Sequence, residues 1–461
     1  MREAPEIERL MGMELYLTAS RGLGGRIRSR FEDFLVEEEL ASGLVAELRP
    51  RRPEGARAGG REVGGRGSFL LCVLVKSGLD TLEAVQRLAR CLRLPEGLVS
   101  FAGLKDARAT TAQFVAIRGL KPERLPGLDL PGVELRPVAF TTEPLSPADL
   151  AANRFHVLVR AVELPEGAVR RELAATLSGL EDLGGLPNFY GHQRFGTTRP
   201  VTHLVGRELL RGNVREAVEL YLAYLGPGES PAAREARSYL AETGDLRGYL
   251  RLLPRGFYYE RLMAEHLLKR PRDYYGALRR LPLRLRRLFV QAYQAYLFNR
   301  FLSARAREGL PLSLPEPGDW MLLLREGCLP EGRPVRADAF RLRELRELAR
   351  GGRAVVSLPL PGHGQALSGG RQGELEQAIM EEEGVRPEDF RLKHMPELAS
   401  PGWLRPALAR LELLEEPRVR EDELSSGCLA LELSFRLPRG AYATVLLREL
   451  MKPPDPLAAG F

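Results

Sequence analysis

Residues 101–113 read Phe-Ala-Gly-Leu-Lys-Asp-Ala-Arg-Ala-Thr-Thr-Ala-Gln and lie between two apolar runs. The pattern predicts a polar loop between two buried strands. In this loop the carboxylate of Asp106 stands between Lys105 and Arg108. Nearby cations lower the pKa of a carboxyl group and keep it ionised, as a catalytic carboxylate requires. On these residues alone, a structural turn is the better explanation, because Lys-Asp pairs are common in loops.

Strand and helix signals alternate around this loop, from residue 24 to residue 180. Period-two apolar patterns predict strands, and apolar residues at intervals of three and four predict helices. The expected strands are residues 24–30, 34–37, 68–75, 133–140 and 154–162, and the expected helices are 81–92 and 168–180. Elements in this order predict one α/β domain with a mixed sheet.

The character changes after residue 200, where helix signals dominate. Helices are expected at residues 217–225, 232–243, 258–268 and 285–307, and strands at 321–324 and 354–358. A clearly alternating strand at 429–437 and a helix at 445–451 follow. We expect the tail from Pro453 onward to fray.

The composition is that of a globular protein of two or three domains. Of its 461 residues, 44% are hydrophobic and 28% charged, and no apolar run approaches the roughly 20 residues of a membrane helix. The first five residues, Met-Arg-Glu-Ala-Pro, are too polar for a signal peptide, so we expect a cytoplasmic protein. The four cysteines form no Cys-x-x-Cys pair, which argues against a zinc site and a disulfide framework. Motifs of nucleotide-binding P-loops, zinc hydrolases and serine hydrolases do not occur.

The net charge of +7 and the pI near 9.3 suit a polyanionic partner. Only six of the 68 cationic side chains are Lys, and Arg both grips phosphates in bidentate fashion and stacks on bases. Genome composition and a hot habitat are alternative causes of this bias. Residues 50–67, rich in Arg, Gly and Pro, are expected to form a mobile loop whose charge suits an RNA backbone.

A second dense motif, residues 187–196, reads Pro-Asn-Phe-Tyr-Gly-His-Gln-Arg-Phe-Gly. Glycine permits close backbone approach, Arg suits phosphate, and aromatic faces can stack on a base. This combination is too specialised for an ordinary loop. The alternative is an aromatic anchor beneath a junction between domains.

Both motifs resemble the TruD family of tRNA pseudouridine synthases. Residues 102–106, followed by Thr111 and Gln113, are similar to the catalytic signature of that family. Residues 187–196 resemble its pattern Asn-Tyr-Phe-Gly-x-Gln-Arg-Phe-Gly, with the two aromatics exchanged. The long chain and the extension ahead of residue 24 resemble archaeal members.

Weaker similarities to the family occur in the same order along the chain, at residues 31–34, 294–299, 360–364 and 438–444. The resemblance implies a pseudouridine-synthase-type fold of the α/β (α+β) class, with a mixed, largely antiparallel sheet flanked by helices. It also implies a mostly helical α/β insertion domain. The expected division is a catalytic domain in two parts, 1–198 and 411–461, around an insertion domain at 199–410.

The resemblance also assigns roles in the site. Asp106 is implied to be the catalytic residue, and Arg28 takes the position of the cation that pairs with it, with an exposed strand edge as the alternative. Asn188 is implied to brace the catalytic loop, and Tyr190 to stack on the target base. Tyr442 matches an aromatic near that base, with a buried aromatic at a strand end as the alternative. Further support is expected from Lys105, and RNA contacts are expected from Arg108, Gln193, Arg194 and Phe195.

The implied reaction is the isomerisation of a uridine in RNA to pseudouridine, without cofactor or metal. The usual target of the family is uridine 13 in the D arm of tRNA, so tRNA is the expected partner and a monomer the expected state. Because N1 and C5 are hidden in stacked RNA, the nucleotide must flip out. Whether Asp106 is a nucleophile at C1′ or a base at the sugar stays open.

Two other classes of function fit parts of the sequence. An RNA-binding or RNA-folding protein could use the same scaffold without chemistry. Loss of the Asp or of its aromatic partner would favour that class, but both positions are filled. A structural α/β protein with a basic surface leaves the motif at 187–196 unexplained.

Overall fold

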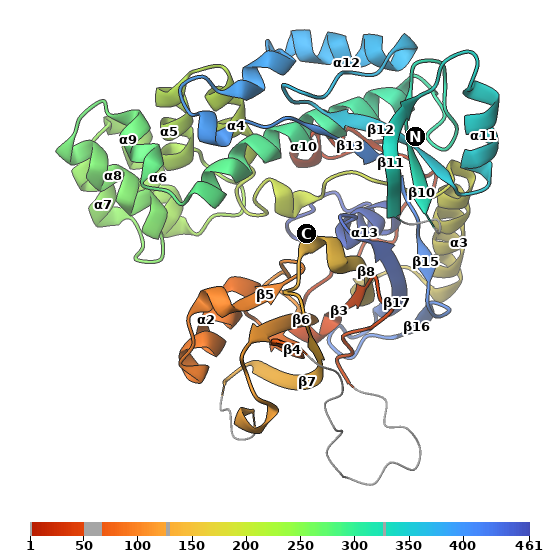
Figure 1. The fold of residues 1–461 in the computed structure, drawn as a ribbon, viewed down its shortest axis with the longest axis horizontal. Coiled ribbons are helices and arrows are strands. Elements are labelled where there is room, and N and C mark those ends of the chain that lie inside the picture. The colour runs from red at the N-terminus through yellow and green to blue at the C-terminus, as the bar shows by residue number, and fades with distance from the viewer. Residues whose placement is uncertain (1, 50–66, 126–129, 326–328) are drawn as a thin grey trace.

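The computed structural model describes residues 2–49, 67–125, 130–325 and 329–461. Within these ranges Figure 1 shows two bodies, a β-rich one in its lower half and a helix-rich one across its upper half. Most of the expected Arg-, Gly- and Pro-rich loop, residues 50–66, lies outside the described residues, and so does Cys328.

The β-rich body is built on one sheet of nine strands, counted over the described ranges. Its order is β15–β17–β8–β3–β6–β4–β7, with β16 beside β17 and β5 beside β6. Every pair is antiparallel except β3 and β6, which run parallel. The strands are β3 (Phe34–Leu40), β4 (Phe69–Ser77), β5 (Val99–Phe101), β6 (Thr110–Arg118), β7 (Val133–Thr141), β8 (Leu150–Val162), β15 (Glu412–Leu413), β16 (Arg418–Glu421) and β17 (Leu429–Pro438). The sheet is therefore mixed and largely antiparallel, which confirms the expected fold class.

Strand β3 places alternate side chains on the two faces of this sheet, as strand geometry requires. Phe34 and Val36 are buried, while Leu35 between them is partly exposed. Val36 lies opposite Phe155 of β8, whose ring stacks on that of Phe435 in β17 with 5.3 Å between ring centres. Such contacts fix the register, because a shift by one residue would turn the buried side chains outward.

Three helices accompany this sheet: α2 (Thr81–Leu92), α3 (Glu166–Leu183) and α13 (Ala443–Met451). α2 begins after Asp80, whose carboxylate accepts a hydrogen bond from the backbone N–H of Glu83. Its apolar face, with Val85 and Leu88, packs into one cluster with side chains of β4 and β6. Every residue of α13 is buried, and Figure 1 shows this helix between the two bodies.

The helix-rich body combines a four-stranded sheet, β11–β10–β12–β13, with a group of helices. Its longest helix, α10, runs along the body in Figure 1. α4 lies so close to α10 that a Cβ on Gly206 would be 2.1 Å from the carbonyl oxygen of Phe289, so glycine is needed there. The strands are β10 (Trp320–Arg325), β11 (Leu329–Arg336), β12 (Ala354–Leu360) and β13 (Trp403–Pro406). The helices are α4 (Thr202–Leu210), α5 (Val214–Ala223), α6 (Pro231–Thr243), α7 (Leu246–Leu252), α8 (Tyr258–Lys269), α9 (Tyr274–Arg279), α10 (Leu283–Arg307), α11 (Leu342–Arg350) and α12 (Gly370–Glu382).

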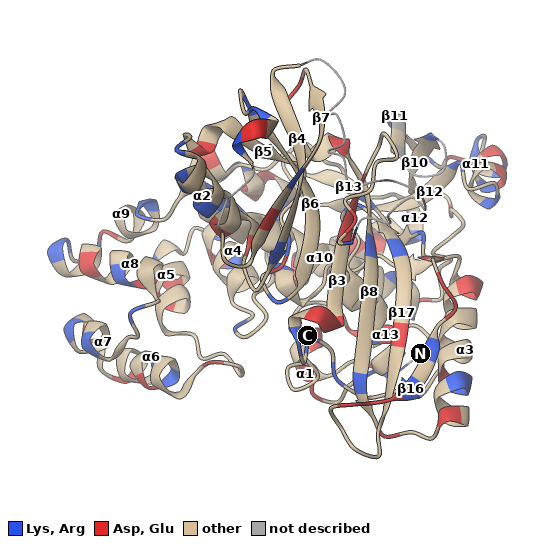
Figure 2. Ribbon diagram, turned by 90° about the horizontal axis from the view of Figure 1, so that it is seen from below, with Lys and Arg blue, Asp and Glu red and all other residues tan. Residues whose placement is uncertain are grey.

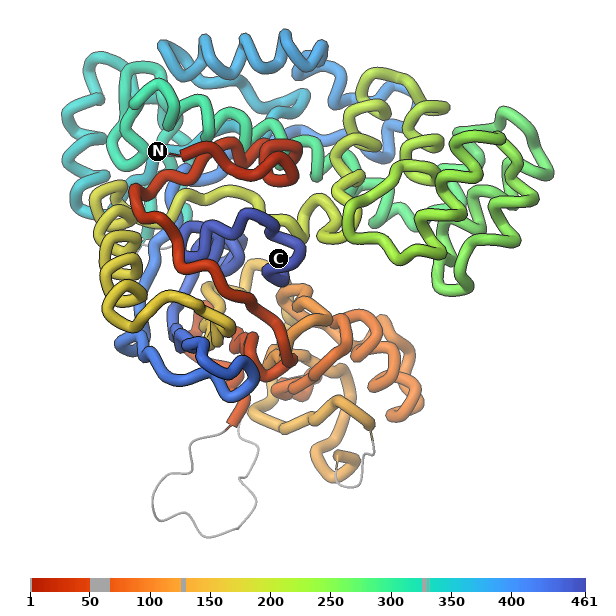
Figure 3. The backbone as a smooth tube through the Cα atoms, turned by 180° about the vertical axis from the view of Figure 1, so that it is seen from behind, coloured from red at the N-terminus to blue at the C-terminus, as the bar shows by residue number. Residues whose placement is uncertain are grey.

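The N-terminal residues cross the back of the molecule, from the helix-rich body down to the β-rich one (Figure 3). Their short elements are β1 (Arg2–Glu3), α1 (Glu6–Arg9) and β2 (Leu15–Tyr16), and a second short pair is formed by β9 (Leu186–Pro187) and β14 (Leu408–Ala409). Buried charges join the N-terminal segment to α13 and the residue after it. Arg448 Nε donates to Glu8 at 2.7 Å, and Lys452 Nζ donates to the Ser20 hydroxyl at 2.6 Å.

The expected strand at residues 24–30 is wrong. This segment makes one isolated bridge, between Arg26 and Arg160, and is otherwise irregular. Gly24 and Arg28 have φ angles of 65° and 59°, in the left-handed region, which an extended strand does not contain. The irregular path matters because it positions the Arg28 side chain.

The tail after Pro453 is ordered, contrary to the expected fraying. The backbone N–H of Ile27 donates to the carbonyl of Ala459 at 2.9 Å, and Phe461 is only 1% exposed. Full burial of a Phe side chain contributes about 1.5–3 kcal/mol, which helps to hold such a segment in place.

The remaining predicted strands and helices are present in the structure. Elements additional to those predicted are helices α4, α7, α9, α11 and α12 and strands β1, β2, β9, β11, β13, β14, β15 and β16. No helix in the described part of the chain combines the length and apolar character needed to cross a membrane.

Candidate active site

Asp106 lies on the loop of residues 102–109 that joins β5 to β6, called the Asp106 loop below. Its Oδ2 accepts a hydrogen bond from Nη2 of Arg28 at 2.8 Å, and its Oδ1 accepts one from the backbone N–H of Arg108 at 3.0 Å. The Asp106 side chain is 31% exposed, whereas that of Arg28 is 4% exposed. A buried guanidinium thus orients a carboxylate that stays accessible to an incoming group.

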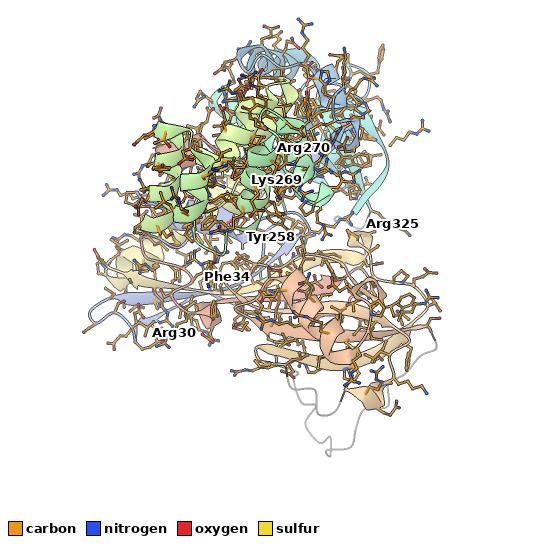
Figure 4. All side chains as sticks on the ribbon, turned by 90° about the vertical axis from the view of Figure 1, so that its left-hand side faces the viewer. Arg30, Phe34, Tyr258, Lys269, Arg270 and Arg325 are labelled. Carbon is orange, nitrogen blue, oxygen red and sulfur yellow. The ribbon has the colours of Figure 1, made fainter. Side chains whose placement is uncertain are left out.

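Arg28 is itself held by its surroundings. Its guanidinium lies over the Phe34 ring, 4.5 Å from the ring centre, and its Nη1 donates to the carbonyl of Gly460 at 3.3 Å. Burial lowers the pKa of Arg28, and the charge of Asp106 opposes that effect. Figure 4 shows Phe34 between the two bodies. The structure therefore places Arg28 beside Asp106 and not on an exposed strand edge.

A second cation, Lys76 of β4, fixes the backbone of the Asp106 loop. Its Nζ donates to the carbonyl oxygens of Leu79 at 2.6 Å, Asp106 at 3.0 Å and Lys105 at 3.4 Å. Lys76 is fully buried, and burial lowers its pKa to about 8 despite the opposing charge of Asp106. The sequence pattern did not single out Lys76, although a lone Lys directly after the apolar run of β4 is a signal that could have found it.

Two neutral side chains tie the same loop to the sheet and to α2. The hydroxyl of Thr81 accepts a hydrogen bond from the backbone N–H of Lys105 at 2.8 Å and donates to Oε1 of Gln113 at 2.9 Å. Nε2 of Gln113 in turn donates to the carbonyl of Gly103 at 3.1 Å. Gln113 belongs to the motif found in the sequence. Its side chain bonds to the loop at Gly103 and also to Thr81, which itself bonds to the loop at Lys105.

Lys105 does not form an ion pair with Asp106 in the described structure, although the two are neighbours in sequence. Its Nζ lies 2.5 Å from Oε1 of Glu38 in β3, and the two side chains are 7% and 0% exposed. Glu38 Oε2 also accepts a hydrogen bond from the backbone N–H of Phe114 at 2.8 Å. A buried carboxylate needs a cation nearby to offset the cost of burying its charge. Among the described residues, Lys105 is the cation that pairs with Glu38. Lys105 therefore anchors the loop to the sheet instead of facing Asp106.

The Tyr190 ring of the second motif is enclosed by two cations and two aromatics, and one of the cations is Arg194, whose Cζ lies 5.5 Å from the ring centre. The Arg405 guanidinium lies 4.0 Å from its ring centre, and the Phe298 and Tyr442 rings meet it edge-on at 5.8 and 5.9 Å. The side chain of Asn299 clamps the Tyr190 backbone with hydrogen bonds of 2.8 and 3.1 Å. Burial raises the pKa of Tyr442. The two tyrosines predicted to stack on the base thus lie together.

Asn188 connects the second motif to β13 and makes no hydrogen bond to the Asp106 loop among the described residues. Its Nδ2 donates to the carbonyl of Pro406 at 3.0 Å, and its Oδ1 accepts from Nη2 of Arg405 at 2.6 Å. The same Nη2 donates to the carbonyl of Gly440 at 2.8 Å. Nδ2 and Oδ1 of Asn188 each have a hydrogen-bond partner here, and neither partner belongs to the Asp106 loop. Arg405 joins the two bodies, and no sequence motif pointed to it.

The four residues predicted to contact RNA lie in different environments. Phe195 is fully buried, so it belongs to the core and cannot contact RNA in this structure. Gln193 is turned toward α13, where its Oε1 accepts a hydrogen bond from the hydroxyl of Thr444 at 3.1 Å. Arg194 is half-buried and Arg108 is exposed, so these two are available to a phosphate backbone.

A cleft of about 850 Å³ lies between the two bodies beside the second motif. Its lining includes Asn188, Tyr190, Trp403, Arg405, Arg410, Arg436 and Arg439. Asp106 is not part of this lining, but Ala151 is, and its neighbour Leu150 lies against the Asp106 loop. A Cβ on Gly103 would be 3.3 Å from Cδ2 of Leu150. The Asp106 loop therefore lies beside the first residue of β8, next to a residue that lines the cleft.

The Asp106 loop provides a partly exposed carboxylate beside a buried cation, and the second motif provides a tyrosine ring that meets a second tyrosine edge-on. A carboxylate can act as a nucleophile or as a general base, and rings beside an Arg suit a flat base. Among the described residues, no three His, Cys, Asp or Glu side chains gather in a way that would hold a metal ion, and Cys72, Cys91 and Cys428 are free thiols.

Comparison with known proteins gives one consistent result. The profile of the family described as tRNA pseudouridine synthase D (TruD) matches residues 10–450. A probable tRNA pseudouridine synthase D from Methanococcoides burtonii is 35% identical over 455 residues, which are 98% of each chain. Another from Methanopyrus kandleri is 41% identical over 391 residues, 85% of this chain and 87% of its own.

A solved structure shows the same fold. The crystal structure of the TruD protein from Methanosarcina mazei covers 98% of this chain and 99% of its own, with a TM-score of 0.79 and 35% sequence identity. Sequence similarity over nearly the whole chain and similarity of fold therefore agree. The chain belongs to the tRNA pseudouridine synthase D (TruD) family.

Proposed function

We propose that this protein converts uridine 13 in the D arm of tRNA to pseudouridine, with Asp106 as the catalytic carboxylate. The observation that carries the proposal is the ion pair in which a buried Arg28 holds the accessible carboxylate of Asp106 at 2.8 Å. The family and the names of the relatives support the reaction and the substrate class.

The reaction rearranges bonds within one nucleotide, so it consumes no second substrate. The bond from C1′ to N1 breaks, the uracil turns, and C5 bonds to C1′. The proton that C5 loses balances the proton that N1 gains. Asp106 acts at C1′ as a nucleophile or at the sugar as a base, and Arg28 keeps its carboxylate in one orientation.

Tyr190 and Tyr442 are proposed to hold the uracil while it is detached from the sugar. Arg405 lies 4.0 Å and Arg194 5.5 Å from the centre of the Tyr190 ring, and these two cations would flank a base that stacks there. Stacking of this kind tolerates rotation of the base in its own plane, which the reaction requires. A site with little water also protects the detached sugar from hydrolysis.

We propose that residues 199–410 act as an insertion domain that closes over a catalytic domain formed by 1–198 and 411–461. The cleft of about 850 Å³, with Arg410, Arg436 and Arg439 in its lining, is the expected entrance for the RNA. A monomer in the cytoplasm stays a prediction.

The purified protein and an unmodified tRNA transcript test this proposal, with pseudouridine located by chemical mapping. The proposal predicts conversion at position 13 and none in a transcript with cytidine there. Conversion at another position would contradict uridine 13 as the target but would support the pseudouridine synthase activity. Tight RNA binding without any conversion would contradict the enzyme and favour a non-catalytic RNA-binding protein.

A further inference from the structure

The positive charge of the chain is concentrated in one helical segment. Residues 246–287, which comprise α7, α8, α9 and the start of α10, contain twelve Lys and Arg against three Asp and Glu, a net charge of +9. Because the whole chain has a net charge of +7, all other residues together carry −2. Figure 2 shows the Lys and Arg positions in blue on these helices. We call residues 246–287 the basic lobe.

Most cations of the basic lobe have no carboxylate partner in the described structure. Of its twelve Lys and Arg side chains, only Arg286 forms an ion pair among the described residues, with Glu397 at 2.6 Å. Two of its carboxylates are themselves engaged, Glu260 by Arg237 at 3.0 Å and Asp273 by His266 at 2.8 Å. The exposed lobe cations without an ion pair among the described residues include Arg255, Lys269, Arg272 and Arg280. Like charges held together without counterions repel one another, so a surface of this kind favours a polyanion.

Two exposed arginines on other helices do have an acidic partner. Arg170 of α3 pairs with Glu166 at 2.6 Å, and Arg343 of α11 pairs with Glu347 at 3.4 Å. Both pairs join neighbouring turns of one helix, a common arrangement on solvated helix faces. Among the described residues of the basic lobe, no Lys or Arg forms such a pair within one helix, although Glu265 stands four residues before Lys269. The excess of cations over carboxylates distinguishes the lobe, because the rest of the chain carries a net charge of −2.

The lobe also carries a hollow and aromatic rings that suit nucleic acid. A hollow of about 250 Å³ is lined by three cations, Lys269, Arg270 and Arg280, together with Leu262, Glu265 and His266. Tyr258 is 62% exposed, and its ring meets that of Tyr259 edge-on with 5.5 Å between ring centres. Cations grip phosphates, and exposed tyrosine rings stack on bases or pack against sugars.

The position of the lobe separates it from the cleft. Figure 1 shows α7, α8 and α9 at the far end of the helix-rich body, away from β10, β12 and β13, which contribute to the cleft. In the view of Figure 4, Tyr258, Lys269 and Arg270 lie above Phe34, whose ring underlies the Arg28 guanidinium.

We propose that the basic lobe is a docking site for the phosphate backbone of the substrate RNA, separate from the cleft that receives the flipped nucleotide. Its occupant is a helical part of a folded RNA, which presents regularly spaced phosphates to Arg and Lys. The identity of this RNA as tRNA rests on the proposed function, but binding of a structured polyanion does not. A tRNA held at both places has one orientation, whereas a short RNA reaches only the cleft.

A pair of matched variants tests the docking site. The lobe variant carries Arg255→Glu, Lys269→Glu, Arg272→Glu and Arg280→Glu, and a milder version carries Gln at the same positions. The control variant carries Arg170→Glu, Arg171→Glu, Arg343→Glu and Arg350→Glu, exposed positions on α3 and α11. Both Glu variants change the net charge of the protein by the same amount. Circular dichroism and Tm show that each variant is folded.

Binding of full-length tRNA, measured by fluorescence anisotropy over a range of salt concentrations, gives the first readout. The lobe variant should bind at least roughly tenfold more weakly, and the slope of log Kd against log salt should fall by about 3, as loss of four phosphate contacts predicts. The control variant should keep the wild-type slope. The Gln version should show the same loss of affinity and of slope to a smaller extent, because it removes the positive charges without adding negative ones.

Turnover gives the second readout. For full-length tRNA the lobe variant should raise KM and keep kcat at saturation, because the lobe does not touch the reacting atoms. For a short hairpin that contains only the target arm, the lobe variant and the wild type should have equal kcat/KM. A structural defect would lower turnover on both RNAs alike.

Unchanged tRNA affinity and salt slope in both lobe variants would overturn the docking site, and would point to an acidic protein as the partner of this surface. Equal weakening by the control variant would overturn it as well, since the effect would then be one of total charge. A wild-type protein that binds structured RNA through the lobe but forms no pseudouridine would refute the proposed function and support the docking site.

Discussion

The guanidinium of Arg28 holds the carboxylate of Asp106 at 2.8 Å, although 78 positions separate the two residues in sequence. Arg28 is fixed in turn by the Phe34 ring and by the carbonyl of Gly460. The carboxylate is therefore oriented by a side chain that is already buried and immobilised. Orientation established before substrate arrives costs nothing at the moment of reaction.

Arg28→Ala should lower kcat on the order of 100-fold, because a reacting group displaced by about 1 Å loses that much. Arg28→Lys should recover part of the rate, since Lys keeps the charge but loses the planar fork and the stacking on Phe34. Single-turnover rates at saturating tRNA measure the effect. Wild-type rates for Arg28→Ala, with the protein folded, would show that the ion pair has no part in catalysis.

Lys76 gives the site a pH dependence with opposite effects on turnover and stability. Burial lowers its pKa to about 8, whereas an unfolded Lys has a pKa of about 10.4. As pH rises through about 8, the Lys76 ammonium loses a proton and with it one of the N–H donors that hold the backbone of the Asp106 loop. Turnover should therefore fall. Between about 8 and 10.4 the unfolded state binds more protons at this residue, so the contribution of Lys76 to the free energy of unfolding rises with pH.

The Lys76→Met variant isolates this contribution. Its turnover should be low and should lack the alkaline fall that the wild type shows near pH 8. The difference in Tm between wild type and variant should shift in favour of the wild type above that pH. Identical pH–rate profiles for the two proteins would rule out Lys76 as the group that titrates.

Lys105→Met should destabilise the protein by about 3–5 kcal/mol, because the buried Glu38 is then left without its cation. Adding Glu38→Gln should recover much of this loss, since a neutral amide can still accept the hydrogen bond from Phe114. Urea unfolding of the wild type, both single variants and the double variant forms a complete cycle. Additive effects of the two substitutions would mean that the pair does not interact as the distance indicates.

Tyr190→Phe should be nearly silent, because the Tyr190 hydroxyl has no hydrogen-bond partner among the described residues. Tyr190→Ala should cost about 1–3 kcal/mol, the usual scale for stacking of a base on an aromatic ring, with part of the loss in kcat. Phe189→Leu, at a fully buried neighbour, should lower Tm and leave kcat unchanged. Normal turnover in Tyr190→Ala would move the stacking role to Tyr442.

The parts of the site that the sequence predicts are those carried by contiguous motifs. Asp106, Gln113 and Tyr190 each lie in a short stretch that contains several charged, polar or aromatic residues. The alternation of apolar residues indicates the neighbouring strands. The mixed sheet follows from the same alternation. Partners on distant strands leave no such pattern: Lys76 and Glu38 meet the Asp106 loop only because β4 and β3 both pair with β6.

Asn188 shows the other limit of prediction from sequence. Its motif indicates an amide with a structural task, but the partner depends on which strand passes beside it, and here β13 supplies Arg405 and Pro406. Phe195, expected to contact RNA, is buried because the residues after it turn into α4 of the helix-rich body. Neither outcome is encoded in local spacing, since both depend on tertiary contacts.

The most direct test of the central claim is the single-turnover rate of Asp106→Asn on a tRNA transcript that the wild type converts. Asn is nearly isosteric with Asp and can still accept a hydrogen bond from Arg28, but it is neither a nucleophile nor a useful base. The variant should keep the Tm and the tRNA affinity of the wild type and form no pseudouridine above background. Formation of pseudouridine by Asp106→Asn at the wild-type rate would contradict the assignment of Asp106 as the catalytic residue.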